Sequence, residues 1–214
     1  MTDTTEDLRR YPPGEPARYV GRHARPRGTS VSPRHVLPDR EVWTPRHLLD
    51  DADTPSLRTL SARVEIARRL ATLGAPWRVL HAVPIGDRAV DHLVIGPAGV
   101  FTIDTKHHPG AKIVVRGDSV TVDGADQPYV ATSRDQARQA AELLSARALF
   151  DVDVRALVAV FGAPGGFTVK AQAYDGVVNV LTRKEIVPHL WSSPEVLGAP
   201  SIERIYEVAR ELAA

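Results

Sequence analysis

Two aspartates and a lysine on a predicted β-hairpin have the types and spacing of a metal site. Residues 90–107 are typical of two strands joined by a tight turn, with Asp91 on the first strand and Asp104 and Lys106 on the second. Side chains in a strand alternate between its two faces, so Asp104 and Lys106 share one face. The hairpin therefore collects acidic oxygens and one ammonium group in a small region.

The register of this hairpin predicts that the two aspartates face each other. A four-residue turn at residues 96–99 pairs Ile95 with Val100, which places Asp91 opposite Asp104 on the face that carries the lysine. Sheets normally avoid opposed carboxylates because the two charges repel each other. A divalent cation between them would reverse the sign of that interaction, since the ion is then the largest local charge.

This set of side chains is suited to metal-assisted hydrolysis of a phosphodiester. Mg²⁺ prefers a few carboxylate oxygens together with water and substrate phosphate. A neighbouring lysine can hold a water or a phosphate oxygen and offset charge in the transition state. The Asp-x-Lys triplet alone is weak, because roughly half a match is expected by chance in a chain of this composition. The cross-strand Asp91 makes the pattern more specific.

The segments around the hairpin predict an α/β sandwich built on a mixed sheet. Apolar spacing predicts a first helix that opens at Ser56 and ends before Gly74, and a buried central strand at Val154–Phe161. A second helix is predicted at residues 132–150, with Thr132 or Ser133 as its cap. The other predicted elements are strands at 77–85, 112–116, 119–122, 167–172 and 177–181, and helices at 182–191 and 201–212.

With these motifs, the chain resembles the nuclease-related domain (NERD) family, within the PD-(D/E)XK or restriction-endonuclease-like superfamily. The resemblance covers about residues 60–160 and implies an αβββαβ core with a mixed central sheet flanked by helices, followed here by additional C-terminal strands and helices. The matching segments are a helical Glu65, Val90-Asp91-His92, Gly96-Pro97-Ala98-Gly99-Val100-Phe101, Asp104-Thr105-Lys106 and a helical Gln136.

The resemblance also implies roles for these residues. Asp91, Asp104 and the Thr105 carbonyl would hold Mg²⁺ or Mn²⁺, with Glu65 near the metal. Lys106 would lie at the attacking water, and the catalytic group would also include Gln136.

The chain departs from the family pattern at three places. Asp104 stands where the family more often has Glu, which shortens the reach to a metal by one methylene. Thr132-Ser133 replaces the Asn-Pro that is typical before the helical Gln. His107-His108 follows the lysine where an aromatic residue or asparagine is expected, and histidines there could donate to phosphate or transfer protons.

The leading hypothesis is a Mg²⁺- or Mn²⁺-dependent DNA nuclease. Basic residues near the site would hold the DNA backbone through sequence-independent phosphate contacts; the candidates are Arg116, Arg134, Arg138, His107 and His108. The competing hypothesis is a nuclease-fold module that binds nucleic acid or a protein partner with little or no turnover. A weaker third hypothesis is an RNA-directed enzyme. Because cutting both strands of DNA often takes two catalytic domains, a homodimer is considered as well.

Each candidate residue also has an alternative explanation. Glu65 could pair with Arg68 or Arg69 along its helix, and the two aspartates could pair with nearby basic residues. Lys106 could simply extend from a strand end, and Gln136 could be an ordinary exposed helix residue. A zinc site is the least supported alternative, because no helical pair or tight motif joins the histidines that would form it; these are His81, His92, His107 and His108.

Composition narrows the class of protein. The chain has 214 residues, a net charge of +1 and no cysteine, so a polyanion site must be a local patch and thiolate chemistry is excluded. No apolar run predicts a membrane helix or a signal peptide, and we expect a cytoplasmic protein. Residues 1–55 hold eight of the 17 prolines and balanced charges, which predicts a flexible arm before a domain at residues 56–214.

Overall fold

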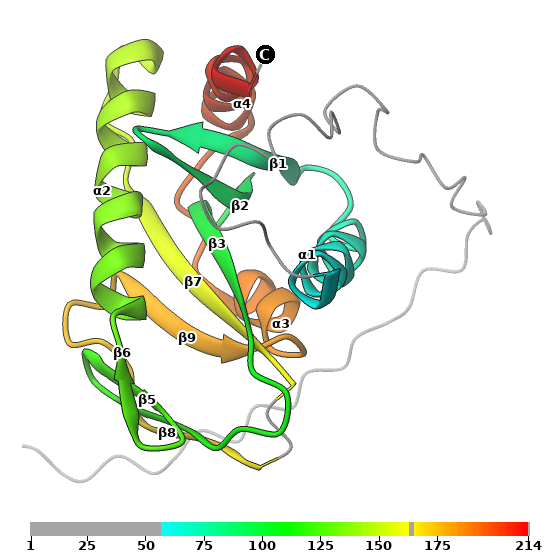
Figure 1. Ribbon diagram of the computed structural model, residues 1–214. Coiled ribbons are helices and arrows are strands. Elements are labelled where there is room, and N and C mark those ends of the chain that lie inside the picture. Colours follow the sequence, from blue (N-terminus) through cyan, green and yellow to red (C-terminus); the bar gives the residue numbers. More distant parts are fainter. Residues whose placement is uncertain (1–56, 163–164, 214) are drawn as a thin grey trace, which may run out of the picture. The chain divides into compact units, whose positions relative to one another are not determined.

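A mixed sheet with helices on both faces is the main feature of the computed structural model, which describes residues 57–162 and 165–213 (Figure 1). The predicted arm at residues 1–55 and its boundary lie outside the described residues. The helices are α1 (Leu57–Leu70), α2 (Tyr129–Ala148), α3 (Ile186–Ser192) and α4 (Ala199–Ala213). The strands are β1 (Arg78–Ile85), β2 (Arg88–Gly96), β3 (Gly99–His107), β4 (Ile113–Arg116), β5 (Ser119–Val122), β6 (Ala125–Gln127), β7 (Val154–Phe161), β8 (Phe167–Ala171) and β9 (Val178–Thr182).

The larger sheet has five strands in the order β1-β2-β3-β7-β9. Strand β2 runs antiparallel to both of its neighbours, β1 and β3, whereas β3, β7 and β9 run parallel. Apart from β4, β5 and β6, which come between β3 and α2, the order α1-β1-β2-β3-α2-β7 is the αβββαβ core that the family resemblance implied. A smaller sheet, β6-β5-β4-β8, contains the predicted meander.

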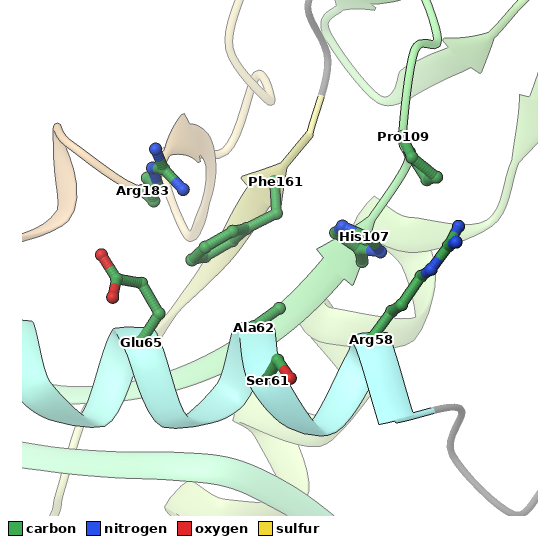
Figure 2. Close-up of a pocket in the computed structure, with 8 residues that line it drawn as sticks. All are labelled: Arg58, Ser61, Ala62, Glu65, His107, Pro109, Phe161 and Arg183. Atoms are coloured by element: carbon green, nitrogen blue, oxygen red, sulfur yellow. The ribbon is translucent and has the colours of Figure 1, made fainter.

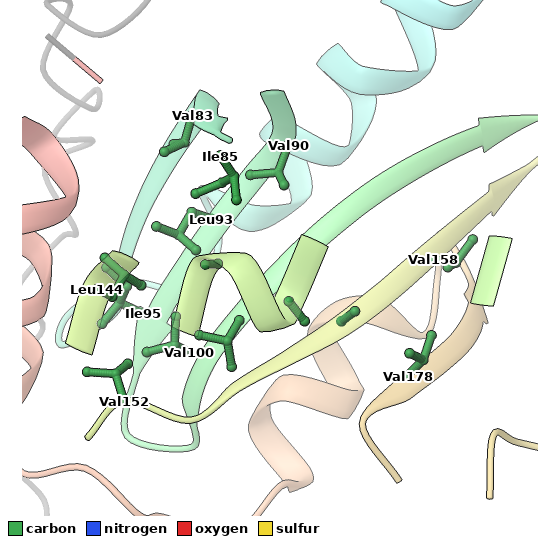
Figure 3. Packing of buried hydrophobic residues seen from close by; sticks show 14 of the residues in the cluster. Val83, Ile85, Val90, Leu93, Ile95, Val100, Leu144, Val152, Val158 and Val178 are labelled. Atoms are coloured by element: carbon green, nitrogen blue, oxygen red, sulfur yellow. The ribbon is translucent and has the colours of Figure 1, made fainter. Parts of the chain in front are cut away.

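Alternation along β7 explains why helices cover both faces of the larger sheet. Val158 and its same-face neighbours belong to one cluster with Leu144 of α2 (Figure 3). The same cluster includes Ile205 of α4. Leu157 points the other way, into a second cluster with Ile66 of α1 and residues of α3. Because β7 is apolar on both faces, it occupies the buried centre of a three-layer α/β/α arrangement, as its continuous apolar run predicted.

The hairpin turn between β2 and β3 depends on two glycines. Gly99 has a φ of 116°, a conformation that L side chains rarely adopt. At Gly96 a Cβ atom would overlap the indole of Trp77, so only glycine leaves room for that ring. The turn therefore fixes the register of the two strands that carry the predicted metal ligands.

Two helices, α2 and α3, begin three or more residues away from the predicted start. Helix α2 begins at Tyr129 after an N-cap Pro128 with no side-chain cap, so the prediction of Thr132 or Ser133 as cap is wrong. Ser133 is buried inside the helix instead. Helix α3 begins at Ile186, because Thr182 still belongs to β9. Within the described ranges, no helix has the length and hydropathy needed to cross a membrane.

Candidate functional site

The carboxylate of Asp91 lies where the β2–β3 ladder stops. Paired positions run from Gly96 opposite Gly99 to His92 opposite Ile103, which confirms the predicted register of Ile95 against Val100. Asp91 is the next residue, and its Oδ2 accepts the Thr105 backbone N–H at 2.7 Å. The Asp91 side chain thus accepts the Thr105 N–H, which a further backbone hydrogen bond of the ladder would otherwise use.

Regular alternation does not extend to Asp91. Between β1 and β2, His81 pairs with His92 and Val83 with Val90, and no pairing joins Ala82 to Asp91. Ala82 has a φ of 52°, which is uncommon for a residue with a Cβ atom and costs about 1 kcal/mol or more. The expectation that strict alternation positions the Asp91 side chain is therefore wrong, since the strand is irregular at this residue.

Helix α1 supplies a cation to the same carboxylate. Nε of Arg63 lies 2.7 Å from Oδ1 of Asp91, and the Asp91 side chain is only 3% exposed. The two atoms are at ion-pair distance, but the N–H does not point at the oxygen, so Arg63 Nε is buried without a hydrogen bond. We regard the contact as a Coulombic pair rather than a directional hydrogen bond.

Burial makes the negative charge of Asp91 costly. Removal from water, and to a smaller extent repulsion from Asp104, together raise the pKa of Asp91 to about 6. Arg63, the Thr105 N–H and Lys106 act against this rise by favouring the charged form. The prediction that Asp91 and Asp104 oppose each other as a ladder pair is wrong, because the pairing of β2 with β3 ends at His92 and Ile103.

The other aspartate is paired with the predicted lysine. Nζ of Lys106 lies 2.5 Å from Oδ2 of Asp104, and both side chains are partly exposed. The ammonium group also lies 5.1 Å from the ring centroid of Tyr129, the first residue of α2. An aromatic face attracts a cation at this range, so Tyr129 helps to hold Lys106 in position.

Tyr129 links this pair to His108. Its hydroxyl lies 2.8 Å from Nε2 of His108. Burial raises the pKa of Tyr129 and lowers the pKa of His108, so a phenol donating to a neutral ring is the favoured arrangement. Near neutral pH, this histidine is therefore better suited to positioning Tyr129 than to carrying a positive charge.

Glu65 lies in a different environment from the two aspartates. Its Oε1 accepts hydrogen bonds from Nε and Nη2 of Arg69, which is one of the alternative partners considered for it. It lines an open pocket with His107, Phe161 and Arg183 (Figure 2). It is Arg63, two residues earlier on α1, that reaches Asp91.

The remaining candidate residues differ in their exposure and in their ion-pair partners. Gln136 is half-buried on α2, seven residues after Tyr129 and so on the same side of the helix. Arg116 is exposed at the end of β4. Arg134 pairs with Asp118 and Asp175, and Arg138 pairs with Glu142. These acidic partners reduce the charge that Arg134 and Arg138 present to a phosphate backbone.

The histidines are not arranged as a zinc site. Nδ1 of His81 and Nδ1 of His92 are 2.7 Å apart, with the rings edge to face, and burial lowers the pKa of both. His107 lies in the pocket of Figure 2, whereas His108 contacts Tyr129. Among residues 57–162 and 165–213, no three or more side chains of His, Cys, Asp or Glu are placed to hold a metal.

Two carboxylates and a carbonyl nevertheless fit a hard cation. In a strand, the N–H and C=O of one residue point toward the same neighbour, so the Thr105 carbonyl points to the side from which Asp91 approaches. Mg²⁺ takes oxygen ligands and commonly keeps several waters, which makes a site with few protein ligands sufficient. The chemistry of this donor set is thus compatible with Mg²⁺ or Mn²⁺.

Sequence reasoning missed Arg63 and Tyr129. Arg63 is one of many arginines in the chain, and its partner Asp91 is 28 residues away, so spacing gives no signal. Tyr129 follows a proline and precedes an apolar residue, a pattern that could have indicated an earlier start of α2.

Comparisons with known proteins agree with the resemblance noted in the sequence. Residues 60–161 match the family described as the nuclease-related domain (NERD). No curated protein matches the chain. A structure of Pyrococcus furiosus SfsA in complex with Ca²⁺ is similar at 18% identity and a TM-score of 0.21, over 69% of this chain and 49% of that one. The chain thus spans about half the length of that protein, and the likeness is too weak to support an inference.

Proposed function

We propose that the chain, whose residues 60–161 match the nuclease-related domain family, is a metal-dependent nuclease that hydrolyses phosphodiester bonds of DNA. The main support is a buried acid, Asp91, at the end of the β2–β3 ladder, whose pKa is affected by the charges of Asp104 and Lys106, together with the pairing of Lys106 with Asp104. A buried acid with a raised pKa beside a second acid and a lysine is typical of a functional site.

The proposed metal ligands are the carboxylates of Asp91 and Asp104 and the carbonyl of Thr105. When bound there, Mg²⁺ or Mn²⁺ would lower the pKa of a water and offset negative charge on the phosphate. The backbone N–H of Thr105 holds one oxygen of Asp91, which leaves Oδ1 for other ligands. Glu65 stays a further candidate near the metal, and to bind it the carboxylate would have to exchange its partner Arg69.

The proposed role of Lys106 is to bind oxygen atoms of the substrate or the attacking water. Its ammonium group has three donors and no acceptor, so it can hold such atoms while it remains near Asp104. Its positive charge would offset the charge that develops on the phosphate in the transition state. Tyr129 would keep the ammonium group in place through its ring face.

DNA is the proposed substrate and would be held by phosphate contacts rather than base contacts. Arg116 is exposed at the end of β4 in the smaller sheet, and His107 lines the pocket beside α1. Arg134 and Arg138 would have to exchange acidic partners for phosphate oxygens. Such contacts weaken steeply with salt, so activity should be assayed at low ionic strength first.

The first prediction is a loss of cleavage on removal of Asp104 or Lys106. Purified wild-type protein should be incubated with Mg²⁺ or Mn²⁺ and linear, circular or single-stranded DNA, or RNA, and products separated on gels. Asp104→Ala and Lys106→Ala should each reduce cleavage roughly 100-fold or more, because each removes a group that acts in the transition state. Circular dichroism would check that both variants fold.

Two exposed residues provide matched controls. Asp87→Ala and Lys112→Ala remove one acid and one lysine away from the site, and both should retain cleavage. Undiminished cleavage by both Asp104→Ala and Lys106→Ala would overturn the assignment of the site. Cleavage of RNA but not of DNA would overturn the proposed substrate.

A nucleic-acid-binding module without turnover is the second candidate. The observation in its favour is that each aspartate already has an internal cation, Arg63 for Asp91 and Lys106 for Asp104. Such a module would bind DNA in Ca²⁺, Mg²⁺ or Mn²⁺ without cutting it. A gel-shift assay alongside the cleavage panel separates the two candidates.

A further inference from the structure

Arg63 occupies the oxygen of Asp91 that the backbone leaves free. Oδ2 of this carboxylate accepts the Thr105 N–H, whereas Oδ1 lies 2.7 Å from Nε of Arg63. The carboxylate is almost fully buried, but the Arg63 side chain is 30% exposed. Arg63 is therefore partly exposed, while its Nε lies buried against the acid.

The ion pair between Arg63 and Asp91 is one in which another cation could replace the guanidinium group. Nε of Arg63 makes no hydrogen bond although it is buried, so its attraction to Asp91 is not reinforced by direction. A bidentate arginine–carboxylate pair would be stronger and more specific. The pair still matters electrostatically, since Arg63 favours the charged form of Asp91 against burial and against Asp104.

A guanidinium group and a divalent cation cannot both use this oxygen without strong repulsion. Mg²⁺ binds oxygen at about 2.0–2.1 Å, and Arg63 Nε is only 2.7 Å from the same atom. Because both cations would contact one oxygen atom, they would lie close together. Their repulsion would be on the order of several kcal/mol even at an effective dielectric constant near 20. Binding of a metal at Asp91 therefore requires the guanidinium to move away.

We propose that Arg63 is an internal counter-cation that holds Asp91 in the metal-free protein and competes with the divalent cation for it. The inference rests on the proposed function, because it assumes that Asp91 is a metal ligand. Arg63 stabilises the empty site by offsetting the charge of a buried acid, and it raises the concentration of metal that the protein needs. The concentration of metal therefore decides whether Asp91 is paired with Arg63 or bound to the cation.

The test compares metal binding in variants of helix α1. Arg63→Gln removes the charge and keeps a polar side chain, while Arg68→Gln removes the same charge from an exposed position of the same helix. Isothermal titration with MnCl₂ should give a dissociation constant about tenfold or more lower for Arg63→Gln than for wild type. Arg68→Gln should stay within about twofold of wild type, since an exposed charge at that position is screened.

Thermal unfolding supplies a second readout that does not involve catalysis. Without metal, Arg63→Gln should unfold at a lower temperature than wild type, because Asp91 then lacks its counter-ion. Addition of MnCl₂ should raise its unfolding temperature by more than that of wild type. A dissociation constant for Mn²⁺ that is unchanged or higher in folded Arg63→Gln would overturn the competition.

The wild-type protein offers a test that does not depend on the folding of Arg63→Gln. In ¹⁵N-labelled protein, the Nε–H resonance of Arg63, identified by its absence from Arg63→Lys, should shift when MgCl₂ is added. An unchanged resonance at saturating MgCl₂ would contradict the inference. If wild type cuts DNA but Arg63→Gln binds metal no more tightly, the inference fails and the proposed nuclease stands; if neither protein binds metal, both fail.

Discussion

At the scale of single residues, the main feature of the site is that Asp91 is buried although burial disfavours its charged form. Its pKa is raised from an ordinary value of 3.8 to about 6, first by burial and then by Asp104. Arg63 and Lys106 lower this pKa, but it remains above its ordinary value. The protein thus keeps an acid whose charge would be favoured by one more cation, which is the condition for metal binding.

The pKa of Asp91 predicts how stability depends on pH in the metal-free protein. Between pH 4 and pH 6 the folded protein binds more protons at Asp91 than the unfolded chain does, so this residue lowers stability as the pH rises. Asp91→Asn cannot ionise. The free energy of unfolding of Asp91→Asn relative to wild type should therefore rise between pH 4 and pH 7, by up to about 3 kcal/mol.

Urea unfolding in EDTA at several pH values measures this difference. Asp87→Asn, at an exposed position of the β1–β2 turn, is the control and should show no comparable trend. A difference between Asp91→Asn and wild type that is flat across this pH range would contradict the burial of a charged Asp91.

At the scale of elements, the β2–β3 hairpin determines where the acids lie. Its tight turn made the register predictable, because Ile95 against Val100 follows from the turn length alone. The bounds of β7 were predictable from its continuous apolar run. The irregularity at Ala82 was not, since a positive φ at alanine has no sequence signature. The start of α2 was missed because a proline, not a serine or threonine, precedes it.

The close approach of Trp77 to the turn predicts a sensitive glycine. Gly96→Ala should lower the free energy of unfolding by about 1–3 kcal/mol, because the new methyl group would overlap the indole and force the ring or the turn to move. Gly198→Ala is the matched control, because the nearest heavy atom to a Cβ there is 3.8 Å away. Equal urea midpoints for the two variants would show that Trp77 does not limit the turn.

At the scale of the whole molecule, the site draws on both layers of helices. Arg63 reaches Asp91 from α1 on one face of the larger sheet, and Tyr129 supports Lys106 from the start of α2 on the other (Figure 1). The hairpin acids and the lysine were predictable because they are close in sequence. The contacts of Arg63 and Tyr129 depend on packing between distant elements, which periodicity cannot indicate. The arm at residues 1–55 and the possible homodimer stay predictions.

The central claim is that Asp91 and Asp104 jointly hold one divalent cation, and anomalous diffraction tests it most directly. Crystals of the wild-type protein soaked in MnCl₂ should give one strong anomalous peak bounded by the carboxylates of Asp91 and Asp104 and the carbonyl of Thr105, with Arg63 moved away from Asp91. The absence of such a peak at saturating MnCl₂, with Arg63 still against Asp91 and Lys106 still against Asp104, would contradict the account.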